Sequence, residues 1–142
     1  MKEITGDIWS YLGKAWIVIP TNTQTKKDGT AVMGKGLALQ AAQRFPDLPH
    51  RYGRYLSMAS EALVLENEKL ILLPTKDNWR SPSTLELIKK GVEIINRWAK
   101  HPRVSIITPR LGCGNCQRDW ETEVKPLMIN LPDNVFVITM GE

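Results

Sequence analysis

The sequence predicts an α/β fold in which a mixed, largely parallel sheet is covered by helices on both faces. Two observations support this prediction: short apolar runs alternate with segments of helical spacing, and the apolar runs are continuous instead of alternating with polar residues. Continuous runs of this length are typical of strands that are buried on both faces. Strands that alternate with helices form a sheet between two helical layers.

The length and composition of the chain predict a single domain over residues 1–142, because compact domains cluster around roughly 100 to 150 residues. Apolar residues make up 42% of the chain and charged residues 24%, the ordinary mixture of a soluble globular protein. No apolar run approaches the roughly 18 to 20 residues of a membrane span, and the first residues lack the hydrophobic segment of a secretory signal. We therefore expect a cytoplasmic protein that does not associate with membranes.

The apolar runs give the positions of the expected strands. Four continuous runs predict internal strands at Ala15–Ile19, Lys69–Leu73, Val104–Thr108 and Val135–Met140. Two further segments, Met1–Ile8 and Ala62–Leu65, predict additional strands, and the second of these turns back through residues 66–68.

A first helix is predicted from one stripe of apolar side chains that ends before Pro46. The stripe consists of Leu37, Ala38, Ala41, Ala42 and Phe45. A second helix is predicted over residues 85–99, where apolar side chains again recur at helical spacing. Its start is indicated by Ser83 and Glu86, three residues apart, which is the spacing of a capping box.

A third helix is predicted over Trp120–Asn130 and is entered through Asp119, a residue that favours helix starts. Pro126 lies inside this segment, and proline in a helix interior removes a backbone hydrogen bond. We therefore expect a kink in this helix.

Ligands of such sheets collect beyond the carboxyl ends of the strands, and the first candidate loop follows the strand that ends near Pro20. It contains Gly34, Lys35 and Gly36 and leads into the helix at Leu37. Glycines let the backbone approach a ligand, and a helix amino end presents unpaired N–H groups. The spacing matches neither a P-loop nor GxGxxG, so the segment is either a tight strand-to-helix turn or a phosphate cradle.

A second loop repeats this design at the same edge of the expected sheet. Residues 109–115, PRLGCGN, follow the strand at 104–108 and precede the helix entered through Asp119. Two such loops on adjacent strands could clamp a diphosphate between their amide groups. The pair favours an anion site more strongly than either loop alone.

Cys113 and Cys116 form a C-x-x-C motif, so a thiol redox site is an alternative. Too few residues follow Cys116 to supply the strands that such a fold places after its motif. Zinc is disfavoured because His50 and His101 lack finger-like spacing. No other cluster of His, Cys and carboxylates has ligand spacing, so we expect neither a metal nor an organic cofactor.

Lys76 lies just beyond the predicted strand at 69–73. A lysine in this position is either solvated, paired with a phosphate, or a nucleophile in a desolvated site. The net charge of +4 and the isoelectric point near 9.2 are compatible with an anionic partner and equally with a solvated basic surface.

Taken together, these motifs resemble the macrodomain family, the α/β module that binds ADP-ribose. The resemblance extends over nearly the whole chain and is strongest to the branch that contains the terminal ADP-ribose glycohydrolase and the macrodomain antitoxins that remove ADP-ribose from DNA. It rests on VMGKGLALQ at 32–40 with RFP at 44–46, on LPTKDNWRSPS at 73–83, on LGCGN at 111–115 with Asp119 and Trp120, and on VKPL at 124–127. It implies a three-layer α/β/α fold.

The resemblance also implies roles for individual residues. Asp7 would accept a hydrogen bond from the adenine amino group with Ile8 beside it, and Asn22 would contact the distal ribose. Met33, Gly34, Lys35, Gly36 and Leu37 would line the distal ribose and phosphates, while Leu111, Gly112, Cys113, Gly114 and Asn115 would surround the diphosphate. Lys76 would be the catalytic residue, acting at the anomeric carbon of the distal ribose.

The implied function is hydrolysis of ADP-ribosyl linkages, which releases ADP-ribose from a nucleic-acid or protein acceptor. Two alternatives stay open: phosphatase action on ADP-ribose 1″-phosphate, and binding without catalysis. Some family members have an acid where this chain has Asn115 and Cys116, which favours the binder. The expected partners are ADP-ribose and ADP-ribosylated substrates, including nucleic acid, and the expected state is a monomer. A small module of this kind would also suit a virus or mobile element acting in a host cytoplasm.

Overall fold

The structure is a computed structural model that describes residues 1–59, 62–77, 83–101, 103–113 and 118–140. Its strands form one six-stranded sheet in the order β1-β6-β5-β2-β4-β3. The strands are β1 (Lys2–Gly6), β2 (Trp16–Asn22), β3 (Leu63–Leu65), β4 (Leu70–Lys76), β5 (Ile106–Pro109) and β6 (Val135–Met140). All neighbours pair in parallel except β3 and β4, which pair antiparallel. The predicted mixed, largely parallel sheet is confirmed.

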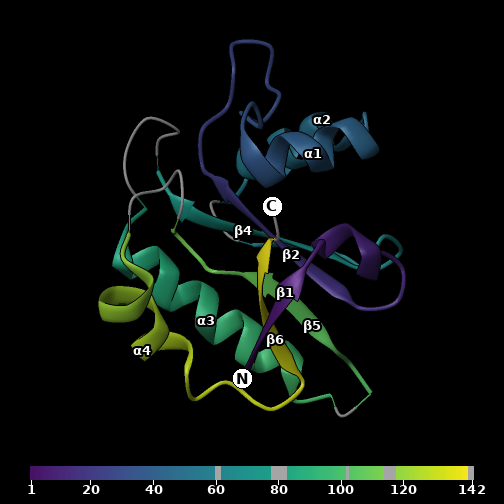
Figure 1. The fold of residues 1–142 in the computed structure, drawn as a ribbon. Coiled ribbons are helices and arrows are strands. Elements are labelled where there is room, and N and C mark those ends of the chain that lie inside the picture. The colour runs from purple at the N-terminus through teal and green to yellow at the C-terminus, as the bar shows by residue number, and fades with distance from the viewer. Residues whose placement is uncertain (60–61, 78–82, 102, 114–117, 141–142) are drawn as a thin grey trace.

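Helices cover both faces of this sheet, which gives three layers (Figure 1). The segments are the 3₁₀ helix η1 (Ile8–Tyr11), α1 (Gly36–Arg44), α2 (Leu48–Leu56), α3 (Leu85–Ala99), the π-helical η3 (Trp120–Val124) and α4 (Lys125–Met128). One apolar cluster joins η1, α1 and α2 to one face, and a second joins α3, η3 and α4 to the other. Among the described residues, none of the helices combines the length and apolar composition that a bilayer crossing requires.

The central strands explain the continuous apolar runs of the sequence. In β2, Ile17 and Ile19 pack into one cluster and Val18 packs into the other. In β4, Leu72 and Leu73 divide between the two faces in the same way. Successive side chains of a strand point to opposite faces, so a strand covered on both sides is apolar at every position.

The strand boundaries differ from the predicted ones mainly at the carboxyl ends. β2 continues to Asn22 and β4 to Lys76, so both strands extend into polar residues that the apolar runs do not include. The strand predicted over Met1–Ile8 ends at Gly6, because Asp7 caps the η1 turn by accepting a hydrogen bond from the Trp9 N–H at 3.0 Å.

The capping box predicted at Ser83 and Glu86 is wrong. Thr84 is the N-cap of α3, and its hydroxyl accepts a hydrogen bond from the Leu87 N–H at 3.2 Å. Ser83 is fully buried, and its hydroxyl donates to Thr75 Oγ1 at 3.3 Å. The Ser83 hydroxyl therefore contacts β4 instead of capping α3. The local sequence does not reveal this contact.

The third predicted helix is irregular, as Pro126 indicated, but it is shorter than predicted. Asp119 caps it by accepting a hydrogen bond from the Thr122 N–H at 2.9 Å. A π-helical turn occupies the first five residues, and the α-helical part that contains Pro126 ends at Met128. The missing N–H of proline is tolerated there because Pro126 lies in the first turn of α4.

The helix α2 was not predicted. Pro49 and Gly53 make its sequence resemble a turn, but Pro49 lies in the first helical turn, where its missing N–H costs nothing. Gly53 is needed because a Cβ at this position would lie 2.0 Å from the Gly29 carbonyl oxygen. The glycine thus allows α2 to touch the loop that follows β2.

The assignment of the α3 cap can be tested by substitution. Thr84→Ala should lower the free energy of unfolding by about 1 kcal/mol, because the Leu87 N–H loses its acceptor. Thr84→Ser keeps a hydroxyl in the same place and should unfold close to the wild type. Urea denaturation of the three proteins measures both effects, and a Thr84→Ala protein as stable as the wild type would contradict the assignment.

Candidate functional site

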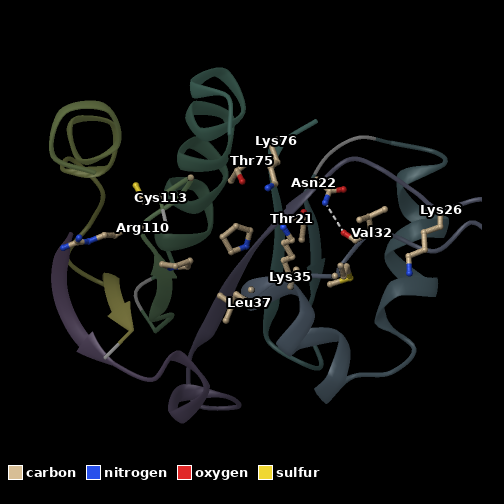
Figure 2. Close-up of a pocket in the computed structure, with 17 residues that line it drawn as sticks. Thr21, Asn22, Lys26, Val32, Lys35, Leu37, Thr75, Lys76, Arg110 and Cys113 are labelled. Carbon is tan, nitrogen blue, oxygen red and sulfur yellow. Dashed lines mark hydrogen bonds between the residues drawn. The ribbon is translucent and has the colours of Figure 1, made fainter. Parts of the chain in front are cut away.

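A cavity of about 640 Å³ opens at the carboxyl edge of the sheet, where β2 lies between β4 and β5 (Figure 2). Its described lining residues are Pro20, Thr21, Asn22, Lys26, Val32, Met33, Gly34, Lys35, Gly36, Leu37, Ala38, Thr75, Lys76, Pro109, Arg110, Gly112 and Cys113. They come from the ends of all three strands and from the segments that follow them. Both predicted glycine loops therefore border one cavity.

The first wall is the segment that leads into α1. Gly34 and Gly36 have no protein atom within 4 Å of the position that a Cβ would take, so both face open space. Gly36 has a φ of +58°, a conformation that disfavours other residues. Lys35 occupies the N-cap position of α1, and its side chain does not cap the helix. The amino end of α1 is therefore directed at the cavity without a side-chain cap.

The loop before this wall is held by hydrogen bonds from β2. The Asn22 Nδ2 donates to the Val32 carbonyl at 3.1 Å, and its Oδ1 accepts from the Gln24 N–H at 2.9 Å. Asn22 thus braces the loop as well as lining the cavity. Beside it, the buried hydroxyls of Thr21 and Tyr52 form a hydrogen bond of 2.7 Å. Burial raises the pKa of the Tyr52 phenol, so the phenol stays neutral at physiological pH.

The second wall is the turn after β5. Gly112 has a φ of +73°, and a Cβ on it would lie 2.6 Å from Ile88 Cδ1 and 3.0 Å from Ser83 Cβ. This glycine is therefore required by close packing against the start of α3, in addition to its backbone conformation. Cys113, which follows it, is partly buried and lines the cavity.

Arg110 lines the cavity, but its guanidinium is directed away from the centre and toward β1 (Figure 2). The guanidinium lies over the Trp120 ring, 5.1 Å from its centroid, and 3.7 Å from a carboxylate oxygen of Glu3. Glu3 also pairs with Lys125 at 3.1 Å and accepts a hydrogen bond from Trp120 Nε1 at 3.1 Å. Glu3 therefore connects the edge strand β1 to the second wall.

Lys76 is the last residue of β4 and enters the cavity between the two walls (Figure 2). Its side chain is half-buried, and its amino group points to the middle of the cavity, as does that of Lys35. The preceding residue, Thr75, is buried, and its carbonyl accepts a hydrogen bond from the Thr84 N–H at 2.9 Å. The end of β4 is thus fixed to the start of α3.

Arg118 connects the second wall to the segment that begins α3. Its backbone N–H donates to the Gly112 carbonyl at 2.9 Å, and its guanidinium Nε donates to the Ser83 carbonyl at 2.5 Å. The turn after β5 and the end of β4 therefore share one set of contacts through Ser83.

Most of the predicted site residues meet at this cavity. Lys76, Asn22, Met33, Gly34, Lys35, Gly36, Leu37, Gly112 and Cys113 line it. Leu111 is fully buried and does not line it. Gly114 and Asn115 lie outside the described residues.

Asp7 and Ile8 follow β1 at the same edge of the sheet, but they are not among the lining residues. Asp7 is exposed and caps η1, while Ile8 is fully buried, with its N–H 3.4 Å from the Met140 sulfur. Their predicted contact with adenine stays a prediction.

The sequence analysis did not select eight of the lining residues. These are Pro20, Thr21, Lys26, Val32, Ala38, Thr75, Pro109 and Arg110. All eight lie next to predicted positions or within the predicted loops, so the edge rule for parallel sheets could have found most of them. Lys26 lies in the middle of the first loop, and the folding of that long loop brings it to the cavity.

The chain matches no protein-family model. It is 34% identical over 101 residues to a DNA ADP-ribosyl glycohydrolase of Mycobacterium tuberculosis, which covers 63% of this chain and 29% of that protein. It is 32% identical over 124 residues to a DNA ADP-ribosyl transferase-DNA ADP-ribosyl glycohydrolase fusion protein of Thermosipho africanus, covering 68% of this chain and 31% of that protein. The chain thus spans less than a third of the length of these curated relatives.

Among solved structures, the macrodomain of Mycobacterium tuberculosis DarG superposes with a TM-score of 0.75 at 28% identity, covering 99% of this chain and 97% of that one. Thermosipho africanus DarTG, solved in complex with ADP-ribose, has a TM-score of 0.76 and covers 99% of this chain and 42% of that one; at 24% identity this likeness concerns the fold.

The three-layer fold, with two glycine-containing loops beside one cavity at the carboxyl edge of its sheet, defines a macrodomain, and the chain belongs to the macrodomain family. Within that family, its similarity lies with the macrodomains of DarG proteins.

The role of Glu3 predicts a pH dependence. The hydrogen bond from Lys125 lowers the pKa of Glu3 below its ordinary value most strongly. The hydrogen bond from Trp120 and the charge of Arg110 lower it further. A lowered pKa contributes stability that is present above the ordinary pKa, near 4.3, and is lost as the pH falls through the lowered one. The effect is small, because the side chain is 36% exposed and water screens the pairs.

Glu3→Gln should therefore be slightly less stable than the wild type at pH 7, and the difference should shrink as the pH falls below about 4. Thermal unfolding at pH 7 and pH 3 measures this. Glu121→Gln is a suitable control, because Glu121 is 71% exposed and its distance to Lys125 is 3.9 Å, longer than the 3.1 Å between Glu3 and Lys125. A stability difference for Glu3→Gln that is equal at both pH values would contradict the assigned pairing.

Proposed function

We propose that this domain binds ADP-ribose and hydrolyses ADP-ribosyl linkages, releasing ADP-ribose from a nucleic-acid or protein acceptor. The observation that carries the proposal is the position of Lys76 between two walls that present backbone and positive charge to one cavity. Two curated relatives of this chain, 34% and 35% identical to it, are named as DNA ADP-ribosyl glycohydrolases, which supports the same activity here.

The cavity is suited to a diphosphate. The uncapped amino end of α1 presents backbone N–H groups and a partial positive charge. Lys26, Lys35 and Lys76 add three ammonium groups, and none of the described lining residues is an aspartate or glutamate. A doubly negative ligand therefore meets attraction from several sides, and the glycines allow it to approach the backbone.

The apolar part of the lining suits the sugar and base. Pro20, Val32, Met33 and Leu37 line the cavity beside these charges. Ligand sites commonly combine an apolar lining with a small number of placed polar groups. A nucleotide sugar needs both, because its rings bury apolar surface while its phosphates need hydrogen-bond donors.

We assign the catalytic role to Lys76. The reaction breaks the bond between the anomeric carbon C1″ of the distal ribose and the acceptor; water supplies a hydroxyl to C1″ and a proton to the acceptor. The amine either attacks C1″ of the opened sugar or stabilises charge that develops beside it. Its position at the end of a buried strand holds it against the cavity, since Thr75 is fixed to α3.

Lys76→Ala should reduce turnover by at least 100-fold, in the range that removal of a nucleophile or charge stabiliser commonly costs. ADP-ribose should still bind within roughly tenfold of the wild-type affinity, because the α1 end and both walls stay in place. Release of ADP-ribose from ADP-ribosylated oligonucleotide and peptide, together with calorimetric titration of ADP-ribose, measures both quantities.

The wild-type protein also decides among the alternatives. Tight ADP-ribose binding without turnover of either substrate would identify a binder, and release of phosphate from ADP-ribose 1″-phosphate alone would identify a phosphatase. Loss of binding together with turnover in Lys76→Ala would argue against the catalytic assignment.

Two glycines of the first wall separate binding from folding. Gly34→Ala places a methyl group in open cavity space at an ordinary backbone conformation, so it should leave the melting temperature close to wild type and weaken ADP-ribose binding. Gly36→Ala should also lower stability by about 1 kcal/mol, because its φ of +58° is unfavourable for alanine. Calorimetry and thermal unfolding of both variants give the comparison, and full ADP-ribose affinity in Gly34→Ala would contradict the placement of the ligand at this wall.

A further inference from the structure

Lys26 is the lining residue that lies at the far end of the cavity from Arg110 and Cys113 (Figure 2). Lys35 and Lys76 lie between these ends in this view. The Arg110 end adjoins β1, because Arg110 pairs with Glu3. Asp7, the residue predicted to contact adenine, follows β1, so in the proposed orientation the adenine lies toward the Arg110 end. The acceptor then lies toward the Lys26 end, beyond Lys76 in this view.

The loop that carries Lys26 is an ordered turn. Its backbone N–H donates to the Thr30 carbonyl at 2.7 Å, and its own carbonyl accepts from the Gly29 N–H at 3.0 Å. The Asp28 carboxylate accepts from the Thr30 N–H at 3.0 Å and from the Thr30 hydroxyl at 2.7 Å. These hydrogen bonds, and to a smaller extent the nearby charge of Lys26, lower the pKa of Asp28.

The turn is also fixed to the body of the protein. The Ala31 N–H donates to the Pro49 carbonyl at 2.8 Å, and Gly53 of α2 packs directly against the Gly29 carbonyl. Asn22 holds the returning strand of the loop through Val32. The backbone of Lys26 is therefore positioned by β2 and α2, and its exposed side chain can pair with a ligand without unfolding anything.

Lys26 adds to the positive charge of the cavity, but it lies away from the α1 amino end, where the diphosphate is proposed to bind. That group has the α1 amino end and Lys35 beside it, and Lys26 belongs to another loop at the end of the cavity. An ammonium held at the acceptor side pairs best with an anion that belongs to the acceptor. In a nucleic acid, the nearest anions are the phosphodiesters on either side of the modified nucleotide.

Resting on the proposed function, we infer that Lys26 binds a backbone phosphate of a nucleic-acid acceptor next to the ADP-ribosylated nucleotide, and so favours nucleic acid over uncharged acceptors. The neighbouring Lys27 is exposed and does not line the cavity, which makes it the matched control. Lys26 acts on acceptor choice, while Lys76 acts on the anomeric carbon.

The test compares wild type, Lys26→Gln, Lys26→Arg and Lys27→Gln on an ADP-ribosylated single-stranded oligonucleotide and on ADP-ribose attached to a free nucleoside. Lys26→Gln should lose roughly tenfold in kcat/KM on the oligonucleotide, mainly through KM, and this loss should clearly exceed its loss on the nucleoside. Lys26→Arg should recover most of it. The slope of log kcat/KM against log salt concentration should fall by about 0.7 in Lys26→Gln, the value of one phosphate contact on a single strand.

Other outcomes overturn the inference in distinguishable ways. Equal losses on both substrates would assign Lys26 to ADP-ribose binding, and equal effects of Lys26→Gln and Lys27→Gln would indicate a diffuse basic surface. Wild-type activity on an ADP-ribosylated peptide but not on the oligonucleotide would overturn this inference while the proposed function stands. Absence of release from every substrate would instead reject the proposed function itself.

Discussion

The parallel pairing of β2 with β4 and β5 is the constraint on which the site depends. Parallel strands end at the same edge of a sheet, so the residues that follow them meet there. The pairing is stabilised by side chains buried on both faces, each worth about 1.5 to 3 kcal/mol when fully buried. Apolar residues such as Val18 and Ile71, which never touch the cavity, therefore determine that Lys76 and the two loops lie together.

The two walls are braced by the protein itself. Asn22 holds the first loop, and the hydrogen bond between Thr21 and Tyr52 joins β2 to α2 beside it. Arg118 and the Ser83 carbonyl hold the second. Asn22, Thr21 and Tyr52 are buried, so the donors and acceptors of their side chains would otherwise be unsatisfied. A ligand that enters such a cavity orders little of the backbone, and less of its binding free energy is lost to conformational entropy.

The distribution of charge gives the cavity a direction. Arg110 is drawn toward Glu3 and Trp120, and its charge serves the connection to β1. The lysines from three different elements remain at the cavity, on the side of α1, β4 and the loop after β2. One end is therefore braced by an ion pair, while the middle of the cavity and its other end carry the lysine ammonium groups. This asymmetry is what a site needs if it holds a nucleotide at one end and receives different acceptors at the other.

The sequence by itself determined the sheet, three of the four α-helices in the described part of the chain and most of the cavity lining, because apolar periodicity and glycine placement are local properties of the chain. Three features were decided only by tertiary structure. Helix α2 forms although it contains Pro49 and Gly53, since packing against the loop at Gly29 outweighs weak local propensity. Lys26 reaches the cavity because contacts with distant parts of the chain fix its loop. Thr84, and not Ser83, caps α3 because the Ser83 hydroxyl contacts Thr75 of β4. No local sequence pattern encodes such contacts.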